Sequence, residues 1–307
     1  MSSLSLTEIN FDPALVFMSG QTFRWRRVDR SEEWIGVVSG NLLKATPNQL
    51  SVVASERGQK VSFQEYFTRY FSFEDNLKII KDSLPRDKYL IDAISKAPFL
   101  RILRQDPWEC LISFVCSINK NIPAISDCVE RLTVKFGRPI ANLDRKYHSF
   151  PEPRALALAT KSELMACNVG FRWRYIQYIA RMVNSGKLDL DSLDKKSYDA
   201  ARKTLISELS GLTLGVGPKV ADCVLLFSLH KCESFPLDVW MLRCIKKYYA
   251  SNLGMDPFLN EKKSISRGNY EKIQPRLRKY FGPFAGYAQQ YLYVKIRNDS
   301  TPNKVLV

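Results

Sequence analysis

The chain has 307 residues, of which 45% are hydrophobic and 25% are charged, a composition typical of a soluble protein with one large or two modest domains. Its 46 Lys and Arg residues outnumber 31 Asp and Glu residues, and the net charge of +15 favours a nucleic acid over a membrane as partner. No apolar run reaches the ~18 residues of a membrane span, and the first residues lack a signal-peptide pattern. We therefore expect a protein that is neither membrane-embedded nor secreted.

The seven cysteines are odd in number, form no Cys-x-x-Cys pair and mostly lie in apolar helical patterns. This usage predicts reduced thiols in an intracellular compartment, not a disulfide framework or a zinc or iron–sulfur site. The two histidines, His148 and His230, are too few for a histidine-based metal centre. We expect no catalytic metal and no cofactor.

Residues 1 to about 60 predict an antiparallel sheet. Apolar runs at 34–38 and 42–45 flank Ser39-Gly40-Asn41, a hairpin signal, and the run at 50–54 continues the meander. Ahead of these strands, polar, aromatic and basic residues surround Gly20, whose spacing alone favours a turn or a bulge.

Helical periodicity begins at Ser62, which forms a possible capping box with Glu65. The aromatic stripe that follows is interpreted as core in preference to a base-stacking platform; it comprises Phe63, Tyr66, Phe67, Tyr70 and Phe71. Further on, Asp106-Pro107-Trp108-Glu109 supplies the start signals of a helix that is apolar on nearly every face and therefore buried.

This buried helix ends at a polar turn that contains Asn119 and Asn121. Such a turn is either a plain connection or a wedge for a duplex. Arg172 lies where basic and aromatic residues interleave at a helix start, which suits either phosphate and base contact or a solvated face. Residues 251–268 are the expected insertion or mobile loop.

Residues 197–230 predict two helices joined by a turn with Gly215 and Gly217, followed by Pro218. Bare glycine N–H groups at a helix N-terminus can approach a phosphate. The turn lacks the GxxxxGK[ST] signature of a P-loop and follows a helix instead of a strand. A helix–hairpin–helix module that binds a nucleic-acid backbone fits this pattern.

Lys219 falls in the first turn of the second hairpin helix, where the dipole favours the neutral, nucleophilic amine. Cys223 lies one turn later on the same face. Asp238 precedes the next helical pattern, 239–248, as an expected N-cap whose carboxylate stays ionised. Taken singly, the lysine also reads as a solvated charge and the aspartate as a simple cap.

With these motifs assembled, the chain resembles the eukaryotic-type 8-oxoguanine DNA glycosylases of the helix–hairpin–helix superfamily. The resemblance spans about residues 11–297 and is strongest at 19–25, 103–111, 215–223, 236–239 and 282–289. It implies an α+β fold with an antiparallel sheet domain at 1–95 and packing helices. A helical domain at 96–307 would contain the helix–hairpin–helix and Asp238.

The resemblance also implies a bifunctional glycosylase and lyase. Lys219 would attack C1′ of a flipped nucleotide, Asp238 would stabilise the cationic sugar, and a Schiff base would permit β-elimination. The carbonyl of Gly20 would accept the N7 proton that 8-oxoguanine carries and guanine lacks. Remaining roles fall to Cys223, Pro236, Gln289 and Tyr293 at the base, and to Asn119, Asn121, Arg172, Gly215, Gly217 and Trp240 at the DNA.

Five positions depart from the family pattern. Ala124 stands where a second cytosine-reading arginine is usual, which predicts weaker discrimination of the opposite base. Lys120 replaces an asparagine of the turn, which adds a phosphate-seeking charge. Trp240 replaces a phosphate-holding histidine, Tyr293 replaces a phenylalanine, and Leu214 replaces a proline.

Two other functions fit parts of the sequence. A glycosylase for alkylated or other damaged bases would share the hairpin and Lys219 but have no use for Gly20 with Gln289. A non-catalytic helix–hairpin–helix scaffold would only grip phosphate, and the pairing of Lys219 with Asp238 argues against it. We expect a monomer that acts on damaged double-stranded DNA in the nucleus.

Overall fold

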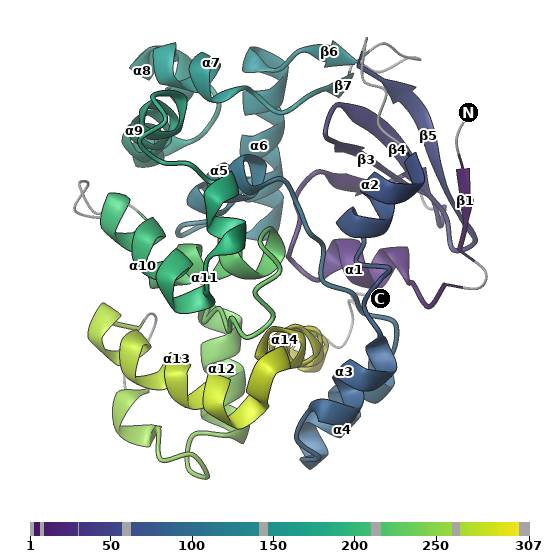
Figure 1. Ribbon diagram of the computed structural model, residues 1–307, viewed down its shortest axis with the longest axis vertical. Coiled ribbons are helices and arrows are strands. Elements are labelled where there is room, and N and C mark those ends of the chain that lie inside the picture. The colour runs from purple at the N-terminus through teal and green to yellow at the C-terminus, as the bar shows by residue number, and fades with distance from the viewer. Residues whose placement is uncertain are drawn as a thin grey trace.

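The computed structural model describes residues 3–6, 9–29, 31–56, 63–140, 147–209, 216–259 and 265–300. A sheet forms one side of the molecule and helices form the rest, which confirms the predicted α+β class (Figure 1). The α-helices are α1 (Pro13–Met18), α2 (Phe63–Tyr70), α3 (Leu77–Ser83), α4 (Lys88–Lys96), α5 (Pro107–Cys116), α6 (Ile122–Phe136), α7 (Pro153–Leu158), α8 (Lys161–Met165), α9 (Trp173–Asn184), α10 (Tyr198–Glu208), α11 (Pro218–Phe227), α12 (Val239–Tyr248), α13 (Arg267–Phe281) and α14 (Ala285–Ser300). Short 3₁₀ helices are η1 (Gly170–Arg172), η2 (Asp191–Lys195), η3 (Asp256–Phe258) and η4 (Gly282–Phe284).

The N-terminal sheet is antiparallel, with the strand order β1-β5-β4-β3-β2. Its strands are β1 (Ser3–Ser5), β2 (Trp25–Arg27), β3 (Trp34–Val38), β4 (Asn41–Ala45) and β5 (Gln49–Ser55), and a separate pair joins β6 (Pro139–Ile140) to β7 (Tyr147–His148). The predicted hairpin is confirmed, because Val38 pairs with Asn41 across Ser39 and Gly40. Both turn residues have positive φ, 45° and 72°, as a two-residue turn that matches strand twist requires.

Aromatic side chains fill the core beneath this sheet. Phe17 of α1 stacks on Trp25 of β2, with ring centroids 3.9 Å apart. Phe67, Tyr70 and Phe71 are buried in the same cluster, which confirms the core interpretation for these three members of the stripe. Ser62, the expected cap of α2, lies outside the described residues.

The helical part is organised around α5 and α11, whose side chains are almost all buried. Asp106 caps α5 by accepting the Glu109 N–H at 2.8 Å, and Pro107 occupies the first turn. These local signals produced the correct helix start. Gly286 fixes the start of α14 against α11, because its N–H donates to the Cys232 carbonyl at 2.7 Å and a Cβ there would meet Leu226.

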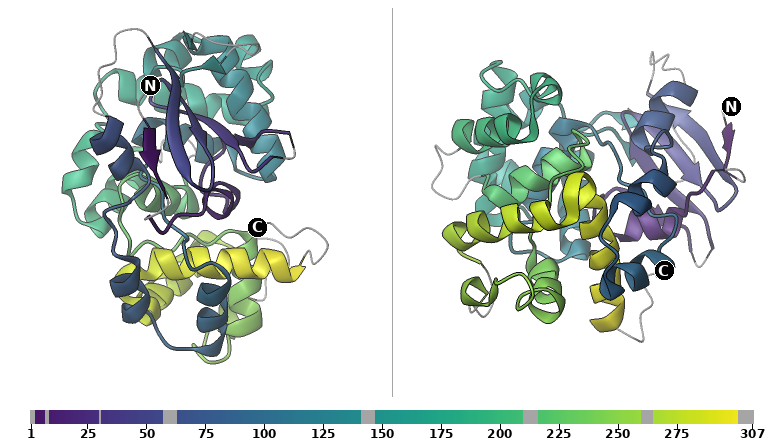
Figure 2. Two further views of the ribbon diagram at one scale, coloured as in Figure 1. Left: turned by 90° about the vertical axis from the view of Figure 1, so that its right-hand side faces the viewer. Right: turned by 60° about the horizontal axis from the view of Figure 1, so that its bottom comes forward.

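Helix α3 precedes the predicted division and α4 ends at Lys96, yet their buried side chains belong to the helical core. Figure 2 shows them beside α14 at the end of the molecule away from the hairpin strands. An ion pair between Lys295 of α14 and Asp92 of α4 holds this contact. The division at residues 95 and 96 stays a prediction, and the core of the second part draws on residues from before it.

Two helices, α10 and α11, form the predicted helix–hairpin–helix, with Ser197 and Gly217 as their N-caps. Residues 210–215 of the turn, including Gly215, lie outside the described residues. Asp238 caps α12 as expected. Within the expected loop at 251–268, the described residues include η3 and the buried side chain of Met255. None of the described helices is long and apolar enough to cross a membrane.

Candidate active site

A cavity of about 770 Å³ opens where the sheet domain, α5, α11, α12 and α14 meet. Segments far apart in the sequence contribute to its wall, among them the helices α5, α11, α12 and α14, which are labelled in Figure 1. Of the thirteen residues predicted for the site, eleven line this cavity: Gly20, Asn119, Asn121, Gly217, Lys219, Cys223, Pro236, Asp238, Trp240, Gln289 and Tyr293. Arg172 is not among the lining residues, and Gly215 is outside the described residues.

Lys219 reaches the cavity from the first turn of α11. Its Nζ donates to Ser117 Oγ at 2.9 Å and lies 5.2 Å from the centre of the Phe114 ring. The Ser117 hydroxyl in turn donates to the Phe114 carbonyl at 2.6 Å. An amine held by one neutral hydroxyl over an apolar ring is oriented without being neutralised by a carboxylate, which suits a nucleophile.

Asp238 faces the same cavity from the N-cap position of α12, where it accepts the Met241 N–H at 2.8 Å. Burial raises the pKa of this carboxyl above its usual value, while the Met241 N–H and the charge of Lys219 act in the opposite direction. The expected cap bond is therefore present, but the effect of burial on the pKa is larger than the effect of this bond. The carboxylate is easier to protonate than a solvated one.

Gly20 enters the cavity from the turn after α1, with φ of +77°. A buried amide network fixes this turn: Gln21 Nε2 donates to the Arg101 carbonyl at 2.9 Å, and Gln105 Nε2 donates to the Gln21 carbonyl at 2.7 Å. A Cβ at Gly20 would lie 2.8 Å from the Tyr293 hydroxyl. Both the positive φ and this close approach require glycine, so the position is a turn whose backbone faces the cavity.

The wall next to Gly20 comes from α14, where Gln289 and Tyr293 share a face as their spacing predicts. Both are almost fully buried, and Gln290 Nε2 donates to Gln289 Oε1 at 2.8 Å. Cys223 of α11 is also buried, and burial raises the pKa of its thiol to about 12. It remains a neutral, polarisable thiol at physiological pH.

The polar turn between α5 and α6 stands at the rim. Asn119 is exposed and has a positive φ of 53°. Asn121 caps α6 by accepting the Ala124 N–H at 3.0 Å. Lys120 differs from the expectation of an outward charge, because its Nζ donates to the Asn168 carbonyl and the Cys128 sulfur. The turn is therefore rigid, with Asn119 at its tip.

Arg172 does not lie at the surface as the sequence suggested. Only 4% of it is exposed, and its guanidinium donates to the carbonyls of Ile118 and Val169. The sequence shows a basic and aromatic helix start but not that η1 turns this arginine inward under the Asn119 turn. A contact with any group outside the protein requires this buried guanidinium to become exposed.

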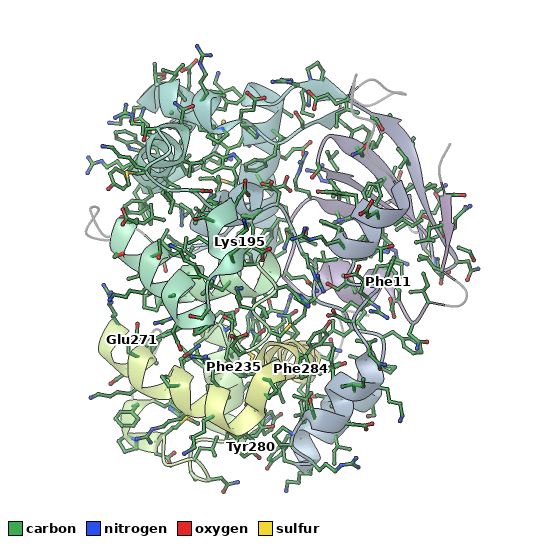
Figure 3. All side chains as sticks on the ribbon, in the orientation of Figure 1. Phe11, Lys195, Phe235, Glu271, Tyr280 and Phe284 are labelled. Carbon is green, nitrogen blue, oxygen red and sulfur yellow. The ribbon has the colours of Figure 1, made fainter. Side chains whose placement is uncertain are left out.

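A buried ionic network supports α11 from behind. Asp222 is fully buried and accepts from Tyr198 Oη at 2.6 Å, Tyr270 Oη at 2.6 Å and Arg202 Nε at 2.9 Å. The Tyr270 hydroxyl also accepts the Leu237 N–H at 3.3 Å. This network connects α10, α11 and α13 to the residue before Asp238, and Glu271, labelled in Figure 3, completes it as the second partner of Arg202.

Sequence reasoning missed three residues of the site: Ser117, Phe114 and Arg297. Phe114 lies in the apolar helix α5 and Ser117 is the C-cap of that helix. Neither belongs to a motif, and only the approach of α11 to α5 brings them to Lys219. Arg297 follows Tyr293 by one helical turn, so the same i, i+4 spacing that paired Gln289 with Tyr293 would have found it.

The chain is similar to known proteins over most of its length. Residues 3–111 match the family described as 8-oxoguanine DNA glycosylase, N-terminal domain. The N-glycosylase/DNA lyase of Saccharomyces cerevisiae is 31% identical over 92% of this chain and 82% of its own length.

Two solved structures also resemble the whole chain. The structure of MBOgg1 with a low-affinity DNA ligand is 30% identical, with a TM-score of 0.81 over 98% of this chain and 100% of the other. The Clostridium acetobutylicum 8-oxoguanine glycosylase/lyase, with duplex DNA containing cytosine opposite 8-oxoguanine, is 28% identical, with a TM-score of 0.79 over 98% and 99%. From sequence, fold and site together, this chain belongs to the 8-oxoguanine DNA glycosylase/lyase family.

Proposed function

We propose that this chain excises 8-oxoguanine from duplex DNA and then cleaves the strand at the resulting abasic site. The observation that carries the proposal is the presence of Lys219, Asp238 and Gly20 in one cavity. A base inside a duplex is out of reach, so the enzyme must extrude it into such a cavity. The net charge of +15 provides the attraction for damaged double-stranded DNA.

In the proposed reaction the neutral amine of Lys219 attacks C1′ as the bond between C1′ and the base breaks. The bonding electrons leave with the base, which takes up a proton. The Asp238 carboxylate stabilises the positive charge that develops on the sugar and assists proton transfer from the attacking amine. Ring opening gives a Schiff base between Lys219 and C1′, loss of a C2′ proton expels the 3′ phosphate, and water releases Lys219.

Recognition of the base follows from the walls of the cavity. We assign the Gly20 carbonyl as acceptor for the N7 proton of 8-oxoguanine, because Gly20 lines the cavity and has no side chain to cover its backbone. Cys223 and Tyr293 supply stacking surfaces on α11 and α14, and Gln289 reads the pairing edge. Pro236 lines the pocket beside them.

At the duplex we assign Asn119 to the space that the extruded base vacates, since it is the exposed tip of a rigid turn. Arg172 would read the opposite cytosine once its buried guanidinium becomes exposed. Position 124, an alanine, supplies no second arginine for this task. Gly215 and Gly217 would seat a backbone phosphate, with Asn121 and Trp240 beside the DNA. We further propose that the protein acts as a monomer in the nucleus.

The substrate is tested by competition. A labelled duplex with 8-oxoguanine opposite cytosine is mixed with an excess of unlabelled duplex that carries either 8-oxoguanine or an alkylated purine. We expect the oxidised competitor to suppress release of the labelled base and the alkylated one to leave it unchanged. Equal suppression by the alkylated duplex, with release of its base, would replace the proposal with an alkylated-base glycosylase.

Acid should inactivate the enzyme through Asp238. Because burial raises the pKa of this carboxyl, the carboxylate is lost at a higher pH than the ~3.9 of a solvated aspartate. Single-turnover base release should therefore decline as the pH falls through that raised pKa. Asp238→Asn should remove the contribution of this carboxyl to the decline in acid and should slow release at neutral pH by roughly 10²- to 10⁴-fold.

Glu109 provides the control for this pH profile. Burial raises the pKa of Glu109 to about 6, against the opposing charge of Arg24, so this group also titrates in the acid range. Glu109→Gln should retain the decline of base release in acid. Two results would contradict the role given to Asp238. One is that the decline of base release in acid disappears in Glu109→Gln, and the other is that the wild-type rate stays constant down to about pH 4.

A further inference from the structure

Arg297 is a cation of the cavity wall that the proposed chemistry does not use. It lies on α14, one turn after Tyr293, and its side chain is partly buried. The guanidinium lies 5.8 Å from the ring centre of Trp240 and 5.5 Å from that of Tyr293. Its Nη1 donates to the Tyr293 hydroxyl at 3.4 Å. Two aromatic rings and a hydroxyl therefore fix its position.

The position of Arg297 relative to the catalytic carboxylate is the second observation. The guanidinium packs on Trp240, which lies two residues after the N-cap Asp238 in the first turn of α12, and all three residues line the same cavity. The charge of Arg297 also opposes the rise in the pKa of Asp238 that burial causes. A nucleotide whose C1′ reacts between Lys219 and Asp238 carries its phosphates one sugar's width away, so a cation on the wall beside Asp238 is within reach of one of them.

Other cations at the cavity have different geometries. Lys219 donates to Ser117, and Lys120 donates to the Asn168 carbonyl. Arg267 is exposed at the start of α13. Lys219 also lies over an aromatic ring and acts on Asp238, but it is the proposed nucleophile. Of the other three, in the part of the chain that the structure describes, Arg297 alone is packed on aromatic rings and acts electrostatically on Asp238. A guanidinium has five N–H donors in a planar fork, so a bond to Tyr293 is compatible with binding a phosphate.

We infer that Arg297 binds a backbone phosphate of the extruded nucleotide and thereby holds its C1′ between Lys219 and Asp238. This inference rests on the proposed function for the identity of the nucleotide. Trp240 and Tyr293 act as positioning residues for the guanidinium. The uncharged ring of Trp240 cannot pair with a phosphate itself, but it holds the cation that does.

The test combines Arg297→Gln with duplexes in which single phosphates are neutral methylphosphonates. The duplexes carry a tetrahydrofuran abasic analogue, which is bound but not processed, and equilibrium affinity is measured for all combinations. With natural phosphates, Arg297→Gln should weaken binding on the order of tenfold and reduce the salt slope by about one. When one of the phosphates that flank the lesion is replaced by a methylphosphonate, the same substitution should cause almost no further loss of affinity.

Arg243→Gln is the matched control, because Arg243 also stacks on Trp240, at 4.7 Å, but is exposed and does not line the cavity. It should lose affinity equally with every duplex or not at all. A loss in Arg297→Gln that is the same with every methylphosphonate, or no loss, overturns the inference. Borohydride trapping of the wild-type protein is measured separately. If the protein is trapped but the effect of Arg297→Gln is the same with every methylphosphonate, only the Arg297 inference is wrong. If that effect vanishes with one methylphosphonate but nothing is trapped, only the proposed lyase activity is wrong.

Discussion

Lys219→Gln should abolish base removal and strand cleavage while the protein still binds a lesion duplex. The glutamine retains a donor for Ser117, which Lys219 contacts at 2.9 Å, but an amide nitrogen has no nucleophilic lone pair. Loss of a covalent nucleophile slows turnover on the order of 10⁴-fold or more. Gel-based assays of base release and strand cleavage, with affinity measured in parallel, check this expectation.

Lys279→Gln controls for the loss of one positive charge, because Lys279 is exposed on α13. It should turn over like the wild type. The result that contradicts our assignment is a Lys219→Gln protein that retains turnover and loses only affinity. That behaviour is expected of a helix–hairpin–helix scaffold in which the lysine binds phosphate.

The largest effect on stability is expected for Asp222→Ala. This carboxylate is fully buried and accepts from two tyrosine hydroxyls and from Arg202. Its removal leaves two buried hydroxyls and the partly buried Arg202 Nε without their acceptor, and breaking a buried ion pair from one side typically costs about 3–5 kcal/mol. The free energy of unfolding, measured by urea titration, should fall by that amount.

Asp199→Ala is the comparison that isolates burial. Asp199 also pairs with an arginine, Arg278, at 3.1 Å, but its side chain is 80% exposed. Exposed pairs contribute about 1 kcal/mol or less, so this variant should unfold close to the wild type. Equal unfolding midpoints for the two variants would show that the Asp222 network does not hold the hairpin helices in place.

Local signals in the sequence predicted much of the structure. The hairpin at Ser39-Gly40 and the caps of α5 and α12 depend on a few consecutive residues, whose preferences act within one turn. The convergence of eleven predicted residues on one cavity followed from the family resemblance, because spacing alone gives no distance between Gly20 and Gln289.

What the sequence did not predict depends on tertiary packing. The Lys219 contact with Ser117 exists because α5 and α11 pack together, and neither helix encodes its partner. Arg172 and Lys120 are cations of the kind that contact DNA, but both donate to backbone carbonyls of the protein itself. Those carbonyls belong to other segments of the chain, so the contacts are visible only once the chain is folded.

Covalent trapping on four duplexes tests the central proposal most directly. Purified protein is incubated with borohydride and a duplex that carries one 8-oxoguanine opposite C, A, G or T, and Lys219→Gln is treated in the same way. We predict an adduct with the wild type on the duplex containing 8-oxoguanine opposite cytosine and no adduct with Lys219→Gln. We also predict that the adduct yield differs less among the four opposite bases than it would if position 124 were an arginine. Absence of an adduct on every duplex would contradict the Schiff-base mechanism.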